Sequence, residues 1–150
     1  MSTQPATGSQ GPAAASNPTN SRSLHTGLWV AQGLLALVFG MAGGFKLLTP
    51  IADLASKLSW VQDTSPALVR FIGASELAGA LGLILPSATR IAPKLTVLAA
   101  IGLLVIMVLG AGVHLMHGEA NRLPGNLLLG GLAGFIAWGR LRAAAIPPRS

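Results

Sequence analysis

Glu76 is the residue of this chain most suited to chemistry, because it is a carboxylate inside a long apolar stretch. It lies midway between Pro66 and Pro86, in the segment RFIGASELAGALGLILP of residues 70–86. A helix of this length crosses a bilayer core of roughly 30 Å, and a carboxylate at mid-membrane costs about 2.5–3.5 kcal/mol on insertion scales. Neighbouring helices must therefore hold Glu76, which predicts a polar site inside a helix bundle.

Three basic side chains are candidate partners of this carboxylate. Lys46 closes the first apolar segment, Arg70 opens the second and His114 closes the third. In an antiparallel bundle these ends meet on one side, and Arg70 lies about 120° around its helix from Glu76, so Lys46 or His114 is the better partner. We predict a small polar ligand-binding pocket formed by these four residues and open to the non-cytoplasmic side.

Three interpretations of this cluster stay open. In the first, Lys46 and Arg70 reach the lipid head groups, and Glu76 is protonated or bonded to one partner. In the second, Glu76 accepts hydrogen bonds from a small ligand, such as a quinone head group, to which the basic residues donate. In the third, Glu76 relays protons or solutes. That route needs polar groups continuing to the cytoplasmic face, and beyond Glu76 the sequence indicates almost none.

A metal site at His114, His117 and Glu119 is the weaker interpretation of the nearby sequence HLMHGE. Histidines three residues apart share a helix face, and a carboxylate would add a third ligand. However, Gly118 follows the second histidine and predicts the end of the helix, and no HExxH pattern is present. We therefore interpret these residues as interfacial histidines and predict no metal.

The composition is typical of an integral membrane protein. Of the 150 residues, 51% are hydrophobic and 9% are charged, against roughly 25% charged in soluble domains. The basic residues are scattered at predicted helix ends and form no stripe, so nucleic acid is not a predicted partner. No cysteine is present, which excludes disulfides, thiolate catalysis and cysteine-held clusters within this chain.

An all-α fold with four transmembrane helices must position these side chains. The apolar segments predict spans at about residues 28–48, 66–86, 94–115 and 123–141. The spans form one membrane domain over residues 24–142. Residues 1–23 are rich in Ser, Thr, Pro and Gly and predict a disordered tail, and residues 143–150 form a C-terminal tail.

Two local patterns refine this arrangement. In the first span, Ala36, Gly40 and Gly44 form a row of small residues that would let another helix approach closely. After it, residues 51–61 show helical spacing but are too short to span a bilayer. They predict a short interfacial helix with Trp60 at head-group depth, either as a connector or as a lid over the bundle.

The basic residues also predict the orientation in the membrane. Four spans place both termini on one side, which carries Arg22, Arg90, Lys94, Arg140, Arg142 and Arg149. The other side carries Lys46, Lys57, Arg70 and Arg122. The positive-inside rule then favours cytoplasmic termini. We predict a multi-pass protein of the cell membrane, with the lipid bilayer as its immediate partner.

Four motifs of the chain resemble the DoxX-like family of small four-helix membrane proteins over about residues 28–140. They are GMAGGFKLL at residues 40–48, the segment 70–86, IAPKLTVLAAIGLL at residues 91–104 and VHLMHGE at residues 113–119. The most specific pieces are Gly-x-x-Lys ending at Lys46 and Arg-Phe-x-Gly-x-x-Glu ending at Glu76.

The resemblance implies a fold and leaves the activity open. The family takes its name from a subunit of a thiosulfate:quinone oxidoreductase, some relatives are linked to oxidative-stress complexes, and most members have no assigned reaction. Without cysteine, this chain would supply the membrane anchor or the quinone-facing part, with the redox centre on a partner protein. We predict an accessory membrane subunit without a reaction of its own. The alternatives are a quinone-binding component of an oxidoreductase complex and a small proton-coupled transporter.

Overall fold

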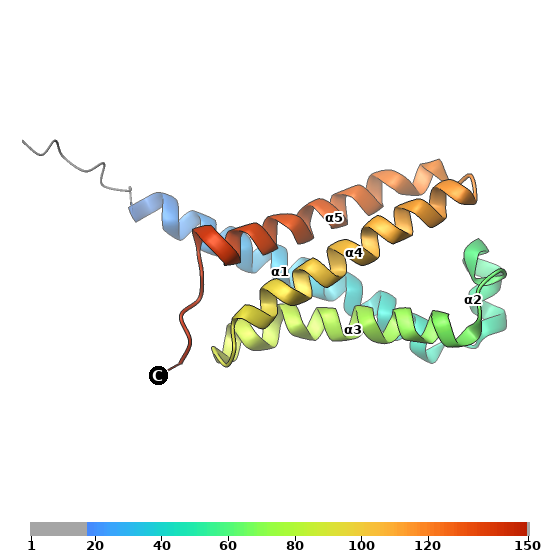
Figure 1. Cartoon of the computed structure of the whole chain (residues 1–150), viewed down its shortest axis with the longest axis horizontal. Helices are drawn as coiled ribbons and strands as arrows, with labels where there is room; N and C mark the ends of the chain where they lie inside the picture. Colours follow the sequence, from blue (N-terminus) through green and yellow to red (C-terminus); the bar gives the residue numbers. More distant parts are fainter. Residues whose placement is uncertain (1–17, 150) are drawn as a thin grey trace, which may run out of the picture.

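The computed structural model describes the backbone of residues 18–149 and the side chains from residue 22 onward. This part of the chain is helical and contains no strand, so the predicted all-α class is confirmed (Figure 1). Its long helices are α1 (Pro18–Leu48), α3 (Pro66–Thr89), α4 (Lys94–Met116) and α5 (Leu123–Trp138). The shorter elements are α2 (Ile51–Lys57), the 3-10 helices η1 (Ser59–Val61) and η2 (Ala120–Arg122), and the π-helical turn η3 (Gly139–Ala143).

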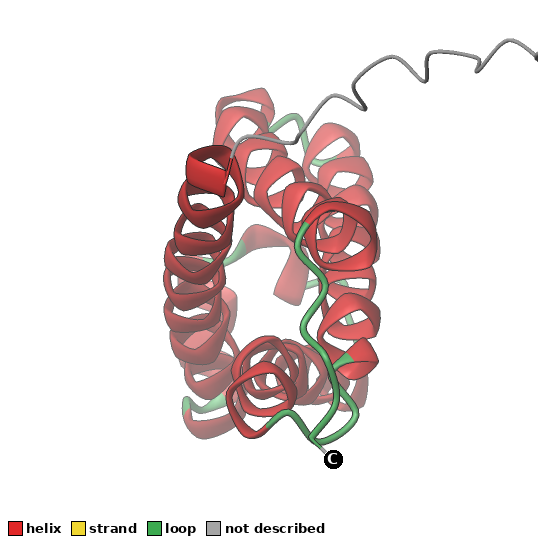
Figure 2. Ribbon diagram, turned by 90° about the vertical axis from the view of Figure 1, so that its left-hand side faces the viewer, coloured by secondary structure: helices red, strands yellow, loops and turns green. Residues whose placement is uncertain are grey.

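The four long helices pack as a ring. α1 contacts α3, α3 contacts α4, α4 contacts α5, and α5 closes the ring on α1 (Figure 2). Residues 90–93 and 117–122 are short connections, which make α3 and α4, and α4 and α5, antiparallel neighbours. α1 and α3 are joined through α2 and η1 and also run antiparallel (Figure 1). We call the end where α1 finishes and α3 begins the Glu76 end. The opposite end, where α5 finishes and the C-terminal segment leaves the bundle, is the Arg140 end (Figure 1).

Three of the long helices have the length and hydropathy of membrane spans: Arg22–Leu48, Pro66–Thr89 and Lys94–Met116. α5 is 16 residues long and falls below that length. The outward faces are apolar, since Leu34, Phe71 and Leu98 are each more than half exposed. Exposed apolar residues distributed around a helical ring are expected where lipid replaces water as the surrounding solvent.

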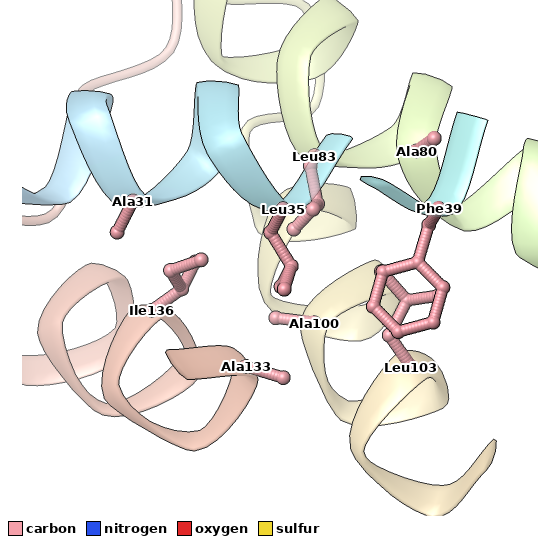
Figure 3. Packing of buried hydrophobic residues seen from close by; sticks show 9 residues of the cluster. All are labelled: Ala31, Leu35, Phe39, Ala80, Leu83, Ala100, Leu103, Ala133 and Ile136. Atoms are coloured by element: carbon pink, nitrogen blue, oxygen red, sulfur yellow. The ribbon is translucent and has the colours of Figure 1, made fainter. Parts of the chain in front are cut away.

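The core of the bundle lies between its two ends. Leu35, Phe39, Leu83, Leu103 and Ile136 are almost fully buried and meet at its centre (Figure 3). Alanines from all four helices pack among them: Ala31, Ala80, Ala100 and Ala133. Alanine leaves room for neighbouring helices to approach, so the larger side chains interdigitate without polar atoms between them.

The element boundaries differ from the predicted ones in two places. α1 begins at Pro18, so residues 18–23 are its first turns and not part of a tail, while residues 1–17 lie outside the described part of the chain. α3 continues through Pro86 to Thr89 and ends with Arg90 in the left-handed region (φ 60°). A proline removes one intrahelical hydrogen bond, and the buried Ser87 beyond it bonds to Thr96 of α4, which holds the last turn in the bundle.

The helix predicted over residues 51–61 is interrupted. α2 ends at Lys57, Leu58 is extended, and η1 follows as a separate turn. Side chains satisfy the freed carbonyls, because Gln62 Nε2 donates to Ala55 O (3.0 Å) and Thr64 Oγ1 donates to Trp60 O (2.7 Å). Such local bonds compete with helix continuation. Leu54 and Val61 of this segment pack on Val69 of α3 as a small second core.

Candidate functional site

A buried ion pair joins α1 to α3 at the Glu76 end. Lys46 Nζ lies 2.8 Å from Oε1 and 2.7 Å from Oε2 of Glu76, so the ammonium contacts both carboxylate oxygens. The side chain of Glu76 is 5% exposed and that of Lys46 is 13% exposed. A carboxylate in an apolar bundle requires such a partner.

Two glycines bring the ion pair's helices together. A Cβ at Gly43 would lie 2.6 Å from Gly73 O and 2.8 Å from Leu77 N, and one at Gly73 would lie 2.8 Å from Lys46 Cβ. The backbones of α1 and α3 therefore cross in contact one turn from Lys46. The predicted row of small residues is only partly involved, because Gly40 makes an ordinary contact with Ala80 and Gly44 has open space around it.

Arg70 belongs to the same end but not to the ion pair. Its Nη1 donates to the backbone carbonyl of Lys46. That carbonyl is in the last turn of α1, where helices leave carbonyl groups without intrahelical partners. Arg70 thus caps α1. Its angular distance from Glu76 on the helix predicted only that it would not be the better partner of that carboxylate.

A cavity of about 280 Å³ opens beside the ion pair. Its polar lining consists of Lys46, Glu76, His114, Arg122 and Asn126, and Arg70 is not part of the lining. Its apolar lining comes from α3, from α4 and from the η1 segment: Leu58, Trp60, Ile72, Ile106, Met107, Leu109 and Val113. The structure thus brings together three of the four predicted ligand-binding residues around one hollow.

The carboxylate of Glu119 connects the two loops at the mouth of this cavity. His114 Nδ1 lies 2.7 Å from Glu119 Oε2, and Ser59 Oγ donates to Oε1 at 2.5 Å. These two hydrogen bonds, Ser59 first, lower the pKa of Glu119, so its carboxylate stays ionised and keeps accepting. Arg122 Nε lies 3.4 Å from the same carboxylate.

A second contact between the loops joins His117 to Asp63. His117 Nε2 lies 3.4 Å from Asp63 Oδ2. The pKa of His117 is raised, chiefly by its hydrogen bond to Val113 O and then by Asp63. Ser59 and Asp63 thus connect the segment of residues 58–64, of which Leu58 and Trp60 line the cavity, to Glu119 and His117.

The three metal candidates are not arranged as a ligand set. His114 bonds to Glu119, whereas His117 turns to Asp63 and to the backbone. Among the described residues, no group of three or more His, Asp or Glu side chains is placed to hold a metal ion.

A second polar cluster lies at the Arg140 end, where the sequence predicted apolar residues and glycine. That prediction is wrong. Arg140 Nε donates to Gln32 Oε1 (2.6 Å), Gln32 Nε2 donates to Leu83 O, and Ser87 Oγ lies 2.8 Å from Thr96 Oγ1. All four of these polar side chains are buried. A glutamine inside the apolar first span was the available signal, since a buried amide needs partners.

Comparison with known families adds one finding. A family model described as "DoxX-like family" matches residues 30–136. No curated protein and no solved structure gives a significant match. The matched region contains Lys46, Glu76, His114 and Glu119, whereas Arg140 lies beyond it.

Proposed function

This chain belongs to the DoxX-like family of membrane proteins, and from that membership and the Glu76 end we propose that it is an accessory membrane subunit that binds a small ligand with a polar head. The observation that carries the proposal is the Lys46–Glu76 pair, because it forms part of the wall of an otherwise largely apolar cavity. A purely structural ion pair would be better enclosed by apolar side chains on every side. In this structure, the cavity leaves one side of the ion pair without packed side chains.

The chemistry of the wall indicates the class of ligand. Lys46 has three N–H donors, of which two are directed to Glu76, and the carboxylate oxygens keep further lone pairs. A ligand carbonyl would accept from Lys46, and a ligand hydroxyl would donate to Glu76. The volume of about 280 Å³ lies just below the range of roughly 300–1,000 Å³ for ligand pockets, which suits a head group rather than a large molecule.

A quinone head group is the more specific candidate within this class. Trp60 and the aliphatic lining would cover the faces of a ring, while the ion pair would bind its oxygens. A quinone would serve as the cofactor, and a partner protein would carry the remaining redox centre, because this chain has no cysteine. In this version the chain is a quinone-binding component of an oxidoreductase complex.

A proton-coupled transporter is less well supported. Between the cavity and the polar cluster at Arg140 lie Leu35, Phe39, Leu83 and Leu103, none of which has polar side-chain atoms. A proton relay needs groups or water along its whole length. The packed layer leaves no such group at that level of the described bundle.

For the membrane arrangement we propose four spans. η3 follows α5 without interruption, so the helical path runs from Leu123 to Ala143 and is long enough to cross. The exposed Leu127, Leu128 and Trp138 give it an apolar outer face. α2 and η1 then lie at the interface, and the excess of basic residues at the Arg140 end favours cytoplasmic termini.

The test fills the cavity without touching the ion pair. Val113 lines the cavity, and Leu115 on the same helix is exposed. In native mass spectrometry of the gently solubilised protein, a small-molecule mass bound to the unmodified chain should be lost in Val113→Phe and kept in the control Leu115→Phe. A short-chain benzoquinone should quench tryptophan fluorescence of the control with about tenfold higher affinity than of Val113→Phe.

Two other results would decide against parts of the proposal. If all three proteins carry the same masses and bind no added quinone, the cavity is not a ligand site. If a non-quinone molecule is lost selectively in Val113→Phe, the accessory binding role stands and the quinone version is wrong. A co-purified redox protein would support the oxidoreductase complex.

A further inference from the structure

The guanidinium of Arg140 is buried with part of its hydrogen-bonding capacity unused. Arg140 is 4% exposed, its Nε donates to Gln32, and its Nη1 makes a long bond of 3.3 Å to Ala144 O. Its Nη2 has no hydrogen-bond partner among the described residues. The face of Trp29 lies 5.3 Å from Cζ. A buried guanidinium keeps its charge, so an unused N–H group there is costly.

No acidic residue compensates this charge at the Arg140 end. The four acidic side chains of the chain are those of Asp53, Asp63, Glu76 and Glu119. All belong to the Glu76 end, in α2, in the loops or in the first half of α3. The Arg140 end instead adds further positive charge from Arg90, Lys94, Arg142 and Arg149. Its local field therefore attracts an anion.

A cavity of about 370 Å³ adjoins Arg140. Lys94, in the first turn of α4, and Ser87 supply further polar lining, and the positive end of the α4 dipole faces the same region. Val97, Leu141 and Ile146 supply apolar lining. Residues 145–148 cover the cavity, and Arg149 N donates to Arg90 O beyond them (3.1 Å).

We propose that this cavity is an oxyanion site for a phosphate group, supplied by an anionic phospholipid or by free phosphate. The forked guanidinium of Arg140 would bind two phosphate oxygens, one on Nη2 and one on Nη1 in place of the Ala144 carbonyl. Lys94 would add a third contact at the rim. The apolar lining beside these groups suits the glycerol and upper acyl part of a lipid. This site is independent of the Glu76 cavity.

The experiment compares phosphate sources on the full-length protein. Thermal unfolding is measured in nanodiscs of phosphatidylcholine, in the same lipid with phosphatidylglycerol, and in phosphatidylcholine with added inorganic phosphate. Relative to phosphatidylcholine alone, whose phosphate is already paired with choline, the unfolding temperature should rise with phosphatidylglycerol or with inorganic phosphate, and native mass spectrometry should retain the bound group. A rise with phosphatidylglycerol alone identifies the lipid, and a rise with inorganic phosphate shows that a free anion is also accepted.

Matched variants separate a built site from general surface charge. Arg140→Gln and Arg142→Gln remove the same charge from the same turn, η3, but Arg142 is exposed. Arg140→Gln should require about tenfold or more ligand for the same rise in unfolding temperature, as expected for losing a charge-assisted hydrogen bond. Arg142→Gln should leave the required concentration nearly unchanged. Lys94→Gln, at an exposed position, should weaken it in a protein that folds normally, whereas Lys57→Gln at the Glu76 end should not.

Two outcomes overturn the proposal. If no phosphate source stabilises the unmodified protein, the cavity does not bind oxyanions. If Lys94→Gln and Lys57→Gln, or Arg140→Gln and Arg142→Gln, respond equally, the attraction comes from the surface as a whole and not from this cavity.

Discussion

In the buried ion pair of Lys46 and Glu76, each charge compensates the other. Removing one partner of a buried pair leaves a charge without compensation, and this typically costs about 3–5 kcal/mol. The two partners here are not equivalent. Lys46 is the more exposed of the two and has a flexible stem, so its ammonium has a route to the interface that the shorter Glu76 side chain lacks.

We expect Lys46→Met to destabilise the bundle more than Glu76→Leu. The first change strands a carboxylate at 5% exposure, whereas the second leaves a lysine that can reach water. The double variant Lys46→Met/Glu76→Leu should recover most of the loss, because it strands no charge. Thermal unfolding in one detergent measures all three. A larger loss for Glu76→Leu than for Lys46→Met would contradict the role given to burial.

Single residues differ in how far their partners follow from sequence. Topology limits the partner of Glu76 to Lys46 or His114, because both end a span on the side of the bundle where the helix of Glu76 begins, and the helical angle disfavours Arg70. The structure selects Lys46, whereas His114 bonds to Glu119. The contact between Gln32 and Arg140 does not follow, because 108 residues separate them. An arginine near a helix end is also the usual sign of a side chain reaching the head groups. Burial of this arginine depends on how α5 packs against α1.

Among the helices, the crossing of α1 and α3 depends on which glycine of α1 faces α3. The sequence shows Gly43 and Gly44 side by side, and spacing by four selected Gly44 for the row of small residues. The structure places Gly43 in the crossing and leaves Gly44 in open space. Whether Gly43 or Gly44 faces α3 differs only by a rotation of α1 of one residue. Apolar periodicity does not distinguish the two when the outward face of the helix is also apolar.

Gly43→Ala and Gly44→Ala should change stability in opposite directions. At Gly43 the new methyl group would meet backbone atoms of α3 at 2.6 and 2.8 Å, so we expect a loss of about 1–3 kcal/mol, typical of overpacking. At Gly44 nothing lies within 4 Å, so replacing glycine inside a helix should add up to about 1 kcal/mol. Thermal unfolding of the two variants in parallel checks both signs. Equal effects would contradict the crossing at Gly43.

Element boundaries were predictable where capping signals are strong and less so elsewhere. Ser65-Pro66 begins α3 as expected, with Ser65 Oγ accepting from Leu68 N. Pro86 was misleading because packing of the residues beyond it carries the helix on to Thr89. The break at Leu58 depends on hydrogen bonds from Gln62 and Thr64, which are visible only once the segment has folded back.

The orientation of the whole molecule can be tested with single cysteines, because the natural chain has none. Ala52 in α2 and Ala145 in the C-terminal segment are both exposed. In intact cells, a membrane-impermeant maleimide should label Ala52→Cys at once and Ala145→Cys only after permeabilisation. The unmodified chain is the blank. The reverse pattern would invert the topology, and equal labelling in intact cells would contradict a membrane barrier between the ends.

The apolar layer formed by Leu35, Phe39, Leu83 and Leu103 also decides where a membrane voltage acts. In a bundle that crosses a bilayer, this layer has no polar side-chain atoms and therefore a low dielectric constant, so a large share of the voltage drops across it. Moving one elementary charge through the entire drop is worth about 2.3 kcal/mol per 100 mV. A charge that reaches Glu76 or Arg140 from its own side stops short of the layer and traverses little of that drop. The apolar layer therefore separates the two polar clusters electrically, and each cluster exchanges charge mainly with the compartment on its own side.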